Sequence, residues 1–185
     1  MQFIDKSKFD YGIVQDGTYF CIPASVLSIL KYYDASIRES QFSLILKMIL
    51  SVSDRLPSFR AAVKGIGRCY SAIYIIEQLT PNDFDEWLDN IKHELDNSCP
   101  IAIATRNSAG VHVRVVIGYN DSTKNLFLFN PAIKIENQIK INGSKKIIGA
   151  NLIIESGEED YPYKTALSDW NCQSPARDQL KITKI

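Results

Sequence analysis

The sequence contains few of the residues that build metal or redox sites. It has only two histidines and four cysteines. The cysteines show neither paired metal-ligand spacing nor a dense disulfide pattern, so we predict no metal and no organic cofactor. His93 falls on the solvated face of an amphipathic run, which is typical of a surface histidine. Three cysteines are interpreted as structural thiols, namely Cys69, Cys99 and Cys172.

Neither sign of charge is in excess, because 21 basic and 21 acidic side chains cancel. Without a basic field, nothing indicates a nucleic-acid partner. No run of about 18 apolar residues is present, so no membrane span is expected. Residues 1–12 lack the apolar core of a signal peptide. This predicts a cytoplasmic protein, or one exported without a cleavable signal peptide.

What is present is the composition of a globular domain. The chain has 185 residues, of which 45% are hydrophobic and 23% charged, and this length suits one domain. Its character is mainly helical up to residue 98 and mainly β from 100 to 155. We therefore predict an α+β fold with a domain over residues 1–155 and a polar C-terminal extension over residues 156–185 that packs on it.

Apolar residues at helical spacing predict helices in "ASVLSILKYY", after a first-turn Pro23, and in "SQFSLILKMIL". The stretch "PSFRAAVKGIG" predicts a short third helix that ends at Gly65 or Gly67. A fourth, "TPNDFDEWLDNIKHELDN", has Thr80 placed as its cap. Between these two, "CYSAIYIIEQL" favours a strand.

Five β-type runs follow, separated by turn-forming sequences: "PIAIATR", "VHVRVVIGY", "NLFLFN", "IKIENQIKI" and "KKIIGANLIIE". They predict an antiparallel, twisted sheet. His112 opens the second run, and Asn130 ends the third just before Pro131, which cannot continue a central strand. If the two runs form a hairpin, the start of one lies opposite the end of the other. We therefore predict that His112 and Asn130 are neighbours in space.

Cys21 begins the first helix, where the helix dipole and free N–H groups favour a thiolate. Cysteine catalysis also needs an imidazole and a group that orients it, and His112 and Asn130 supply both. Acyl transfer needs donors for an oxyanion. Gln15, six residues before Cys21, offers a side-chain amide, and the Cys21 backbone N–H offers a second donor.

This arrangement resembles the papain-like cysteine peptidases. More narrowly, residues 13–132, including "CIPASVLSILKYY" and "VHVRVVIGYNDSTKNLFLFNPA", are similar to the compact bacteriocin-leader (double-glycine) peptidases of bacteria in a stand-alone form. The resemblance implies a papain-like fold, with Cys21 at a helix N-terminus packed on a C-terminal antiparallel sheet. It implies that Cys21 is the nucleophile, His112 the general base and acid, Asn130 its orienting partner and Gln15 the oxyanion donor. It also implies a peptide or protein substrate.

Two positions depart from that branch. Ile22 stands where glycine is usual and is expected to crowd the oxyanion region, and Asn130 stands where aspartate is usual. Two other functions stay open. The same groups could serve a thiol transferase or deamidase of transglutaminase or acyltransferase type, because the acceptor of the thioester decides the product. A catalytically inactive domain could instead bind a peptide in its cleft. The sequence sets no oligomeric state.

Overall fold

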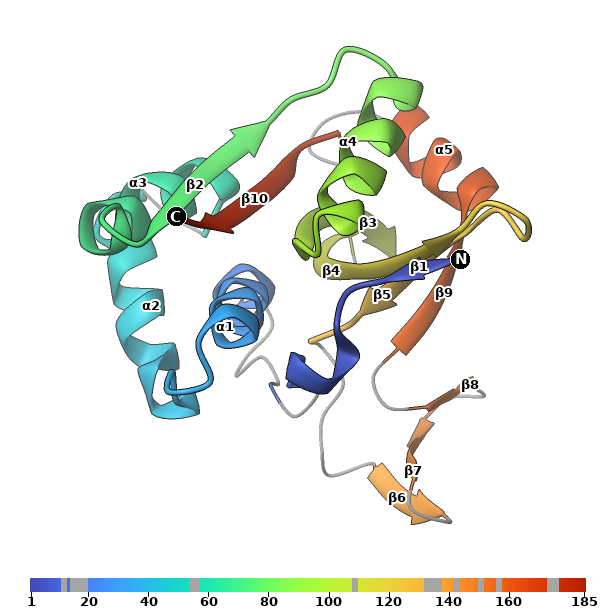
Figure 1. Cartoon of the computed structure of the whole chain (residues 1–185), viewed down its shortest axis with the longest axis horizontal. Helices are drawn as coiled ribbons and strands as arrows, with labels where there is room; N and C mark the ends of the chain where they lie inside the picture. The colour runs from blue at the N-terminus through green and yellow to red at the C-terminus, as the bar shows by residue number, and fades with distance from the viewer. Residues whose placement is uncertain are drawn as a thin grey trace.

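The computed structural model describes residues 1–10, 13, 20–53, 57–107, 110–131, 138–141, 144–149, 152–155, 158–172 and 177–185. These residues form an α+β fold, which confirms the predicted class (Figure 1). The helices are α1 (Cys21–Tyr33), α2 (Phe42–Leu50), α3 (Phe59–Tyr70), α4 (Phe84–Asp96) and α5 (Tyr163–Asn171), with 3-10 turns η1 (Lys6–Lys8) and η2 (Glu39–Gln41). The strands are β1 (Gln2–Phe3), β2 (Tyr74–Leu79), β3 (Ile101–Asn107), β4 (Gly110–Asn120), β5 (Asn125–Phe129), β6 (Gln138–Ile141), β7 (Ser144–Gly149), β8 (Leu152–Glu155), β9 (Glu158–Pro162) and β10 (Gln179–Lys184).

A seven-stranded antiparallel sheet forms the centre of the fold. Its strands follow the order β2-β10-β3-β4-β5-β9, and β1 pairs with the far end of β4. β4 and β5 form the predicted hairpin, which pairs from Val115 opposite Phe129 to Asn120 opposite Asn125 with a shift of register between Val116 and Gly118. Strands β6, β7 and β8 make a separate small sheet. Because β3 pairs with β4 at His112 itself and β5 pairs with β4 from Val115 onward, the strand that carries His112 is held on both sides.

Helix α1 is the buried centre of the helical part. Ten of its 13 residues are buried, and it contacts α2, α3 and strands β3, β4 and β10. Leu27, Ile29 and Leu30 are almost completely inaccessible to solvent, and burying each such side chain stabilises the fold by about 1.5–3 kcal/mol. The packing therefore fixes the N-terminus of α1 against β4.

Helix α3 is longer than the sequence predicts, because it continues through both glycines to Tyr70. The prediction that Gly65 or Gly67 ends this helix is wrong. A β-carbon on Gly65 would lie 2.3 Å from the backbone oxygen of Met48 in α2, whereas one on Gly67 would meet nothing within 4 Å. Gly65 is therefore explained by the close approach of two helices and not by helix termination.

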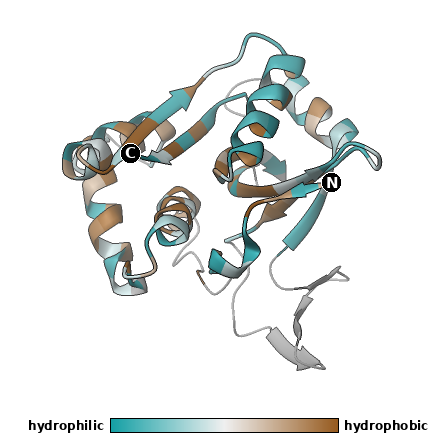
Figure 2. Cartoon of the chain, in the orientation of Figure 1, coloured by the Kyte–Doolittle hydropathy of each residue, from teal (hydrophilic) through white to brown (hydrophobic). Residues whose placement is uncertain are grey.

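Helix α4 begins three residues later than a Thr80 cap would require. The side chain of Asp83 caps it by accepting a hydrogen bond from the Glu86 N–H at 2.8 Å, while the Thr80 hydroxyl donates to Asp178. Figure 2 shows both hydrophilic and hydrophobic residues along α4, as expected of an amphipathic surface helix. Its apolar side chains, Trp87 among them, pack inward.

The C-terminal segment contributes directly to the central sheet. Its described residues form β9, α5 and β10, and β10 lies between β2 and β3 although it is last in the chain (Figure 1). Leu180 and Ile182 are fully buried there. The division of the chain at residues 155 and 156 stays a prediction. None of the helices within the described ranges is both long and apolar enough to cross a membrane.

Candidate active site

Cys21 is the first residue of α1 and is half-buried. The residue before it, Phe20, provides no side-chain cap. The thiol sulfur instead lies within hydrogen-bonding reach of the backbone N–H groups of Cys21 and Ile22 at the start of the helix, and of Val113 in β4. Val113 follows His112 directly. The contact therefore places the thiol alongside β4, at the residue that follows the histidine.

Burial raises the pKa of the Cys21 thiol above its ordinary value. The surrounding N–H groups and the positive charge of Arg114 act in the opposite direction but do not outweigh the loss of hydration. The sequence predicts a thiolate from the helix N-terminus alone. In the structure the pKa of Cys21 is raised instead, because the same packing that holds α1 against β4 also removes water from the sulfur.

His112 and Asn130 meet as the hairpin predicts. β5 ends at Phe129, and Asn130 follows it beside the start of β4. His112 Nε2 lies 2.7 Å from Asn130 Oδ1. The two side chains are only 6% and 8% exposed, respectively, so water competes little for this hydrogen bond. The prediction that these residues are neighbours in space is confirmed.

The hydrogen bond to Asn130 sets the protonation pattern of the imidazole. An amide oxygen can only accept, so Nε2 of His112 must carry the proton in this contact. Nδ1 is then left as the unprotonated nitrogen of the neutral ring. Burial lowers the pKa of His112, and Arg114 lowers it further, while the Asn130 contact and the charge of Glu159 raise it. The net direction is downward, which favours a neutral imidazole.

A connected series of polar contacts joins His112 and Asn130 to three further residues, Thr105, Arg114 and Glu159. Asn130 Nδ2 donates to Glu159 Oε1 at 2.6 Å, and Glu159 Oε2 lies 2.7 Å from Arg114 Nε. Arg114 also donates to the Thr105 hydroxyl, which in turn donates to the backbone oxygen of His112. These contacts connect strands β3, β4 and β9 around the imidazole of His112.

Sequence reasoning missed these three residues. Arg114 follows His112 by two positions and therefore lies on the same face of β4, and Thr105 pairs directly with His112 across β3 and β4. These positions relative to His112 could have identified Arg114 and Thr105 as its neighbours from the strand pattern. Glu159 had no local signal, since it lies 29 positions after Asn130 and reaches it only because β9 pairs with β5.

Two other residues singled out from the sequence complete the picture. Gln15, the expected oxyanion donor, lies outside the described residues. The side chain of Ile22 is 8% exposed and belongs to the hydrophobic core. Its β-branched side chain therefore contributes to packing under the start of α1.

The remaining histidine and cysteines differ in burial. His93 is exposed, as are Cys69 and Cys172, and Cys99 is buried. No group of three or more histidine, cysteine, aspartate or glutamate side chains that could hold a metal ion occurs in the described part of the chain.

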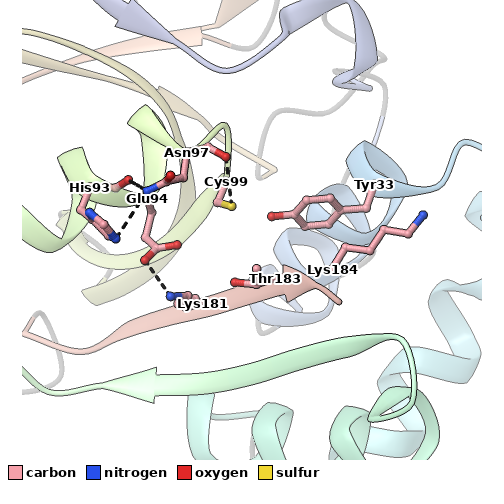
Figure 3. Close-up of a pocket in the computed structure, with 8 residues that line it drawn as sticks. All are labelled: Tyr33, His93, Glu94, Asn97, Cys99, Lys181, Thr183 and Lys184. Carbon is pink, nitrogen blue, oxygen red and sulfur yellow. Dashed lines mark hydrogen bonds and ion pairs between the residues drawn. The ribbon is translucent and has the colours of Figure 1, made fainter.

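A cavity of about 540 Å³ lies near the other end of α1 (Figure 3). At about 1.5 Å per residue, the 13 residues of α1 separate its two ends by roughly 20 Å. Residues that line the cavity make two contacts with one another. Lys181 forms an ion pair with Glu94 at 2.8 Å, and the Cys99 thiol donates to the backbone oxygen of Asn97 at 3.4 Å. The cavity is therefore separate from Cys21. Its lining residues are Tyr33, His93, Glu94, Asn97, Cys99, Lys181, Thr183 and Lys184.

Comparisons with known proteins agree with this architecture. A model of the Peptidase_C39 like family matches residues 6–148. Among solved structures, the chain is similar to the peptidase domain of Streptococcus ComA, a bi-functional ABC transporter involved in a quorum-sensing pathway, with a TM-score of 0.56 and 12% identity over 95% of this chain and 98% of that one. No curated protein sequence matches. The family match covers most of the chain, which therefore belongs to the Peptidase_C39 like family, the bacteriocin-leader branch of the papain-like cysteine peptidases.

Proposed function

We propose that the protein is a cysteine peptidase that hydrolyses an amide bond through an acyl-thioester intermediate. In this proposal Cys21 is the nucleophile, His112 the general base and acid, and Asn130 the residue that orients the imidazole. Gln15 and the backbone N–H of Cys21 are the proposed oxyanion donors. The observation that carries the proposal is the 2.7 Å contact between His112 and Asn130, on the strand whose Val113 N–H contacts the Cys21 thiol.

Acylation starts from a thiol and a neutral imidazole, as the pKa directions of Cys21 and His112 favour. His112 Nδ1 takes the thiol proton as the sulfur attacks the carbonyl carbon of the substrate. The resulting oxyanion accepts hydrogen bonds from N–H donors at the start of α1. When the carbon–nitrogen bond breaks, His112 gives its proton to the leaving amine, and the acyl group remains on Cys21 as a thioester.

Deacylation repeats these steps with water. His112 takes a proton from the water, whose oxygen attacks the thioester carbonyl, and the carbon–sulfur bond then breaks. The proton returns to the sulfur, and the carboxylic acid product leaves. An amine that replaces water would give transfer in place of hydrolysis. A thiol transferase or deamidase therefore remains the second candidate, since His112 and Cys21 would act in the same way.

A peptide library tests the proposal. We expect the wild-type protein to release shorter peptides that carry new carboxyl ends, detected by mass spectrometry, with and without an added primary amine. A Cys21→Ala variant should release none, and a Cys69→Ala variant, which removes an exposed thiol at the end of α3, should match the wild type. Amide products formed only with the amine would favour transfer. Intact peptides, with a folded protein that still binds them, would favour a binding module.

A further inference from the structure

The amide group of Asn130 has a polar partner on each side. Its oxygen contacts His112 Nε2 at 2.7 Å, and its nitrogen donates to Glu159 Oε1 at 2.6 Å. The oxygen and nitrogen of an amide are close in size, so only their hydrogen-bond partners decide which atom points which way. A carboxylate accepts and cannot donate. Glu159 therefore forces the NH₂ group of Asn130 toward β9 and the oxygen toward the imidazole.

The orientation of this amide decides the tautomer of His112. With its oxygen toward the ring, Asn130 stabilises a proton on Nε2 and leaves Nδ1 unprotonated. With the amide reversed, its NH₂ group would face Nε2, and the proton would be forced onto Nδ1. A ring protonated at Nδ1 could not accept the thiol proton through that nitrogen.

Glu159 also brings a negative charge to a site whose orienting residue is neutral. The charge lies next to the amide of Asn130 and is partly balanced by Arg114, whose Nε is 2.7 Å away. The side chains of Glu159 and Arg114 are only 16% and 12% exposed, so solvent screens them weakly. A carboxylate near an imidazole stabilises the imidazolium that forms when a proton is accepted.

We propose that Glu159 is a positioning residue that orients Asn130 and, through it, selects the His112 tautomer able to receive the Cys21 proton. In this arrangement Asn130 and Glu159 divide between them the orienting and charge roles that a single carboxylate could fill. The inference rests on the proposed function for its catalytic meaning, but the tautomer itself is a property of the resting protein.

Among the described residues, two charged groups act on His112, namely Arg114 on β4 and Glu159 on β9. The thiol of Cys21 on α1 contacts the backbone of the next residue of β4, Val113. The residue opposite His112 on β3, Thr105, does not titrate in the accessible range. Glu159 raises the pKa of His112 and Arg114 lowers it. Removal of the Glu159 charge should therefore lower the pKa of His112, and removal of the Arg114 charge should raise it. A purely structural role would not give this pair of opposite shifts.

Nuclear magnetic resonance of ¹⁵N-labelled histidine in the full chain tests the tautomer. The chain has only two histidines, so His93→Gln assigns the spectrum without ambiguity. In the wild type we expect the long-range ¹H–¹⁵N pattern of an Nε2-protonated ring for His112. Glu159→Leu should give a mixture of tautomers. Glu159→Gln keeps an acceptor for Asn130 and should keep the tautomer, but should lower the pKa of His112, whereas Arg114→Gln should raise it.

Glu158→Gln is the matched control. Glu158 is the neighbouring carboxylate on β9, and it binds Lys6 at 2.9 Å. This variant should leave the tautomer, the pKa of His112 and turnover unchanged. Glu159→Gln should reduce kcat for peptide hydrolysis by about ten-fold, with little change in KM, because the imidazolium that forms during proton transfer loses a nearby negative charge.

The outcomes separate the two proposals. An unchanged His112 pKa and kcat in a folded Glu159→Gln protein overturns the role of Glu159, even if the enzyme is an active peptidase. A folded Glu159→Leu protein whose His112 stays protonated at Nε2 alone overturns it as well, and Glu159→Ala takes the place of Glu159→Leu if the latter does not fold. Conversely, a wild-type protein without any turnover contradicts the proposed function, while the tautomer measurement still reports whether Glu159 orients Asn130.

Discussion

The substitution Asn130→Asp would restore the residue that is usual in the bacteriocin-leader branch, and we predict that it destabilises this protein. The nitrogen of Asn130 that now donates to Glu159 at 2.6 Å would become an acceptor oxygen. Two carboxylates would then face each other in a place where both present side chains are shielded from water. A change toward the family pattern should thus be harmful, because Glu159 already supplies the charge.

The size of the effect follows from the geometry. Two unit charges at 2.6 Å repel each other by about 6 kcal/mol at an effective dielectric constant of about 20, and by about 4 kcal/mol if they move apart to about 4 Å. The alternative is to bind one proton. At pH 7 this costs about 4 kcal/mol for a carboxyl whose unfolded pKa is about 4. Both routes give a loss of about 4 kcal/mol in the free energy of unfolding, before any compensation by Arg114.

The sign of the pH dependence is also fixed. In the variant, the new carboxyl at position 130 and the carboxyl of Glu159 share a proton, which raises the folded-state pKa of the pair above its unfolded value. The penalty is therefore absent below about pH 4 and grows by about 1.4 kcal/mol per pH unit above it, until the folded-state pKa is passed. Urea unfolding of Asn130→Asp and wild type at pH 5, 6 and 7 measures this difference. We expect the gap between the two proteins to widen as the pH rises.

Two further variants make the test specific. The exposed pair Asn82 and Glu86 has the same contact, with the amide nitrogen donating to the carboxylate at 3.0 Å, so Asn82→Asp should cost less than about 1 kcal/mol. The double variant Asn130→Asp, Glu159→Gln exchanges the amide and the carboxylate and should recover most of the lost stability. Equal stability of Asn130→Asp and wild type at pH 7, or no recovery in the double variant, would show that the carboxylate of Glu159 does not oppose a second charge at position 130.

The remaining predictions concern packing and protonation. Gly65→Ala should lower the free energy of unfolding by about 1–3 kcal/mol, because its β-carbon would overlap a backbone oxygen of α2. Gly67→Ala should raise the free energy of unfolding by about 1 kcal/mol, because alanine has the higher helix propensity and meets no neighbour there. Equal urea midpoints for the two variants would contradict this packing. At pH 7, iodoacetamide should modify the exposed Cys69 before Cys21, since burial raises the pKa of the Cys21 thiol, and preferential labelling of Cys21 at pH 6 would show that the thiol is already ionised. Peptide hydrolysis should rise with pH through the pKa of His112, which burial places below the ordinary value of 6.5, and an acid limb centred above that value would contradict a neutral resting imidazole.

Local pattern was sufficient for the parts of the fold in which neighbours in sequence are neighbours in space. Apolar spacing located α1, and the turn-rich segment between β4 and β5 predicted the hairpin that brings His112 and Asn130 together. Helix α3 was misjudged because glycine at position 65 serves a contact with α2. Such a contact between separate helices leaves no mark on the helix's own sequence pattern.

The contribution of the C-terminal segment could not be predicted for a related reason. β10 lies between β2 and β3, and β9 pairs with β5, so both strands find their partners far back in the chain. The pattern "QLKITK" does alternate apolar and polar residues, but alternation does not identify the strand with which this segment pairs. Glu159 reaches Asn130 only through such a pairing, which is why the sequence indicated the histidine and its amide but not the carboxylate behind them.

In the proposed mechanism, Cys21 carries the acyl group during turnover. The most direct measurement is an acid quench of the wild-type protein during reaction with a peptide pool, followed by proteolytic mapping of its four cysteines by mass spectrometry. We predict an added acyl mass on the fragment containing Cys21 alone, which hydroxylamine removes, and no such mass in Cys21→Ala. Peptide hydrolysis that proceeds with Cys21 unmodified, or an acyl group found on Cys69 instead, would show that Cys21 is not the nucleophile.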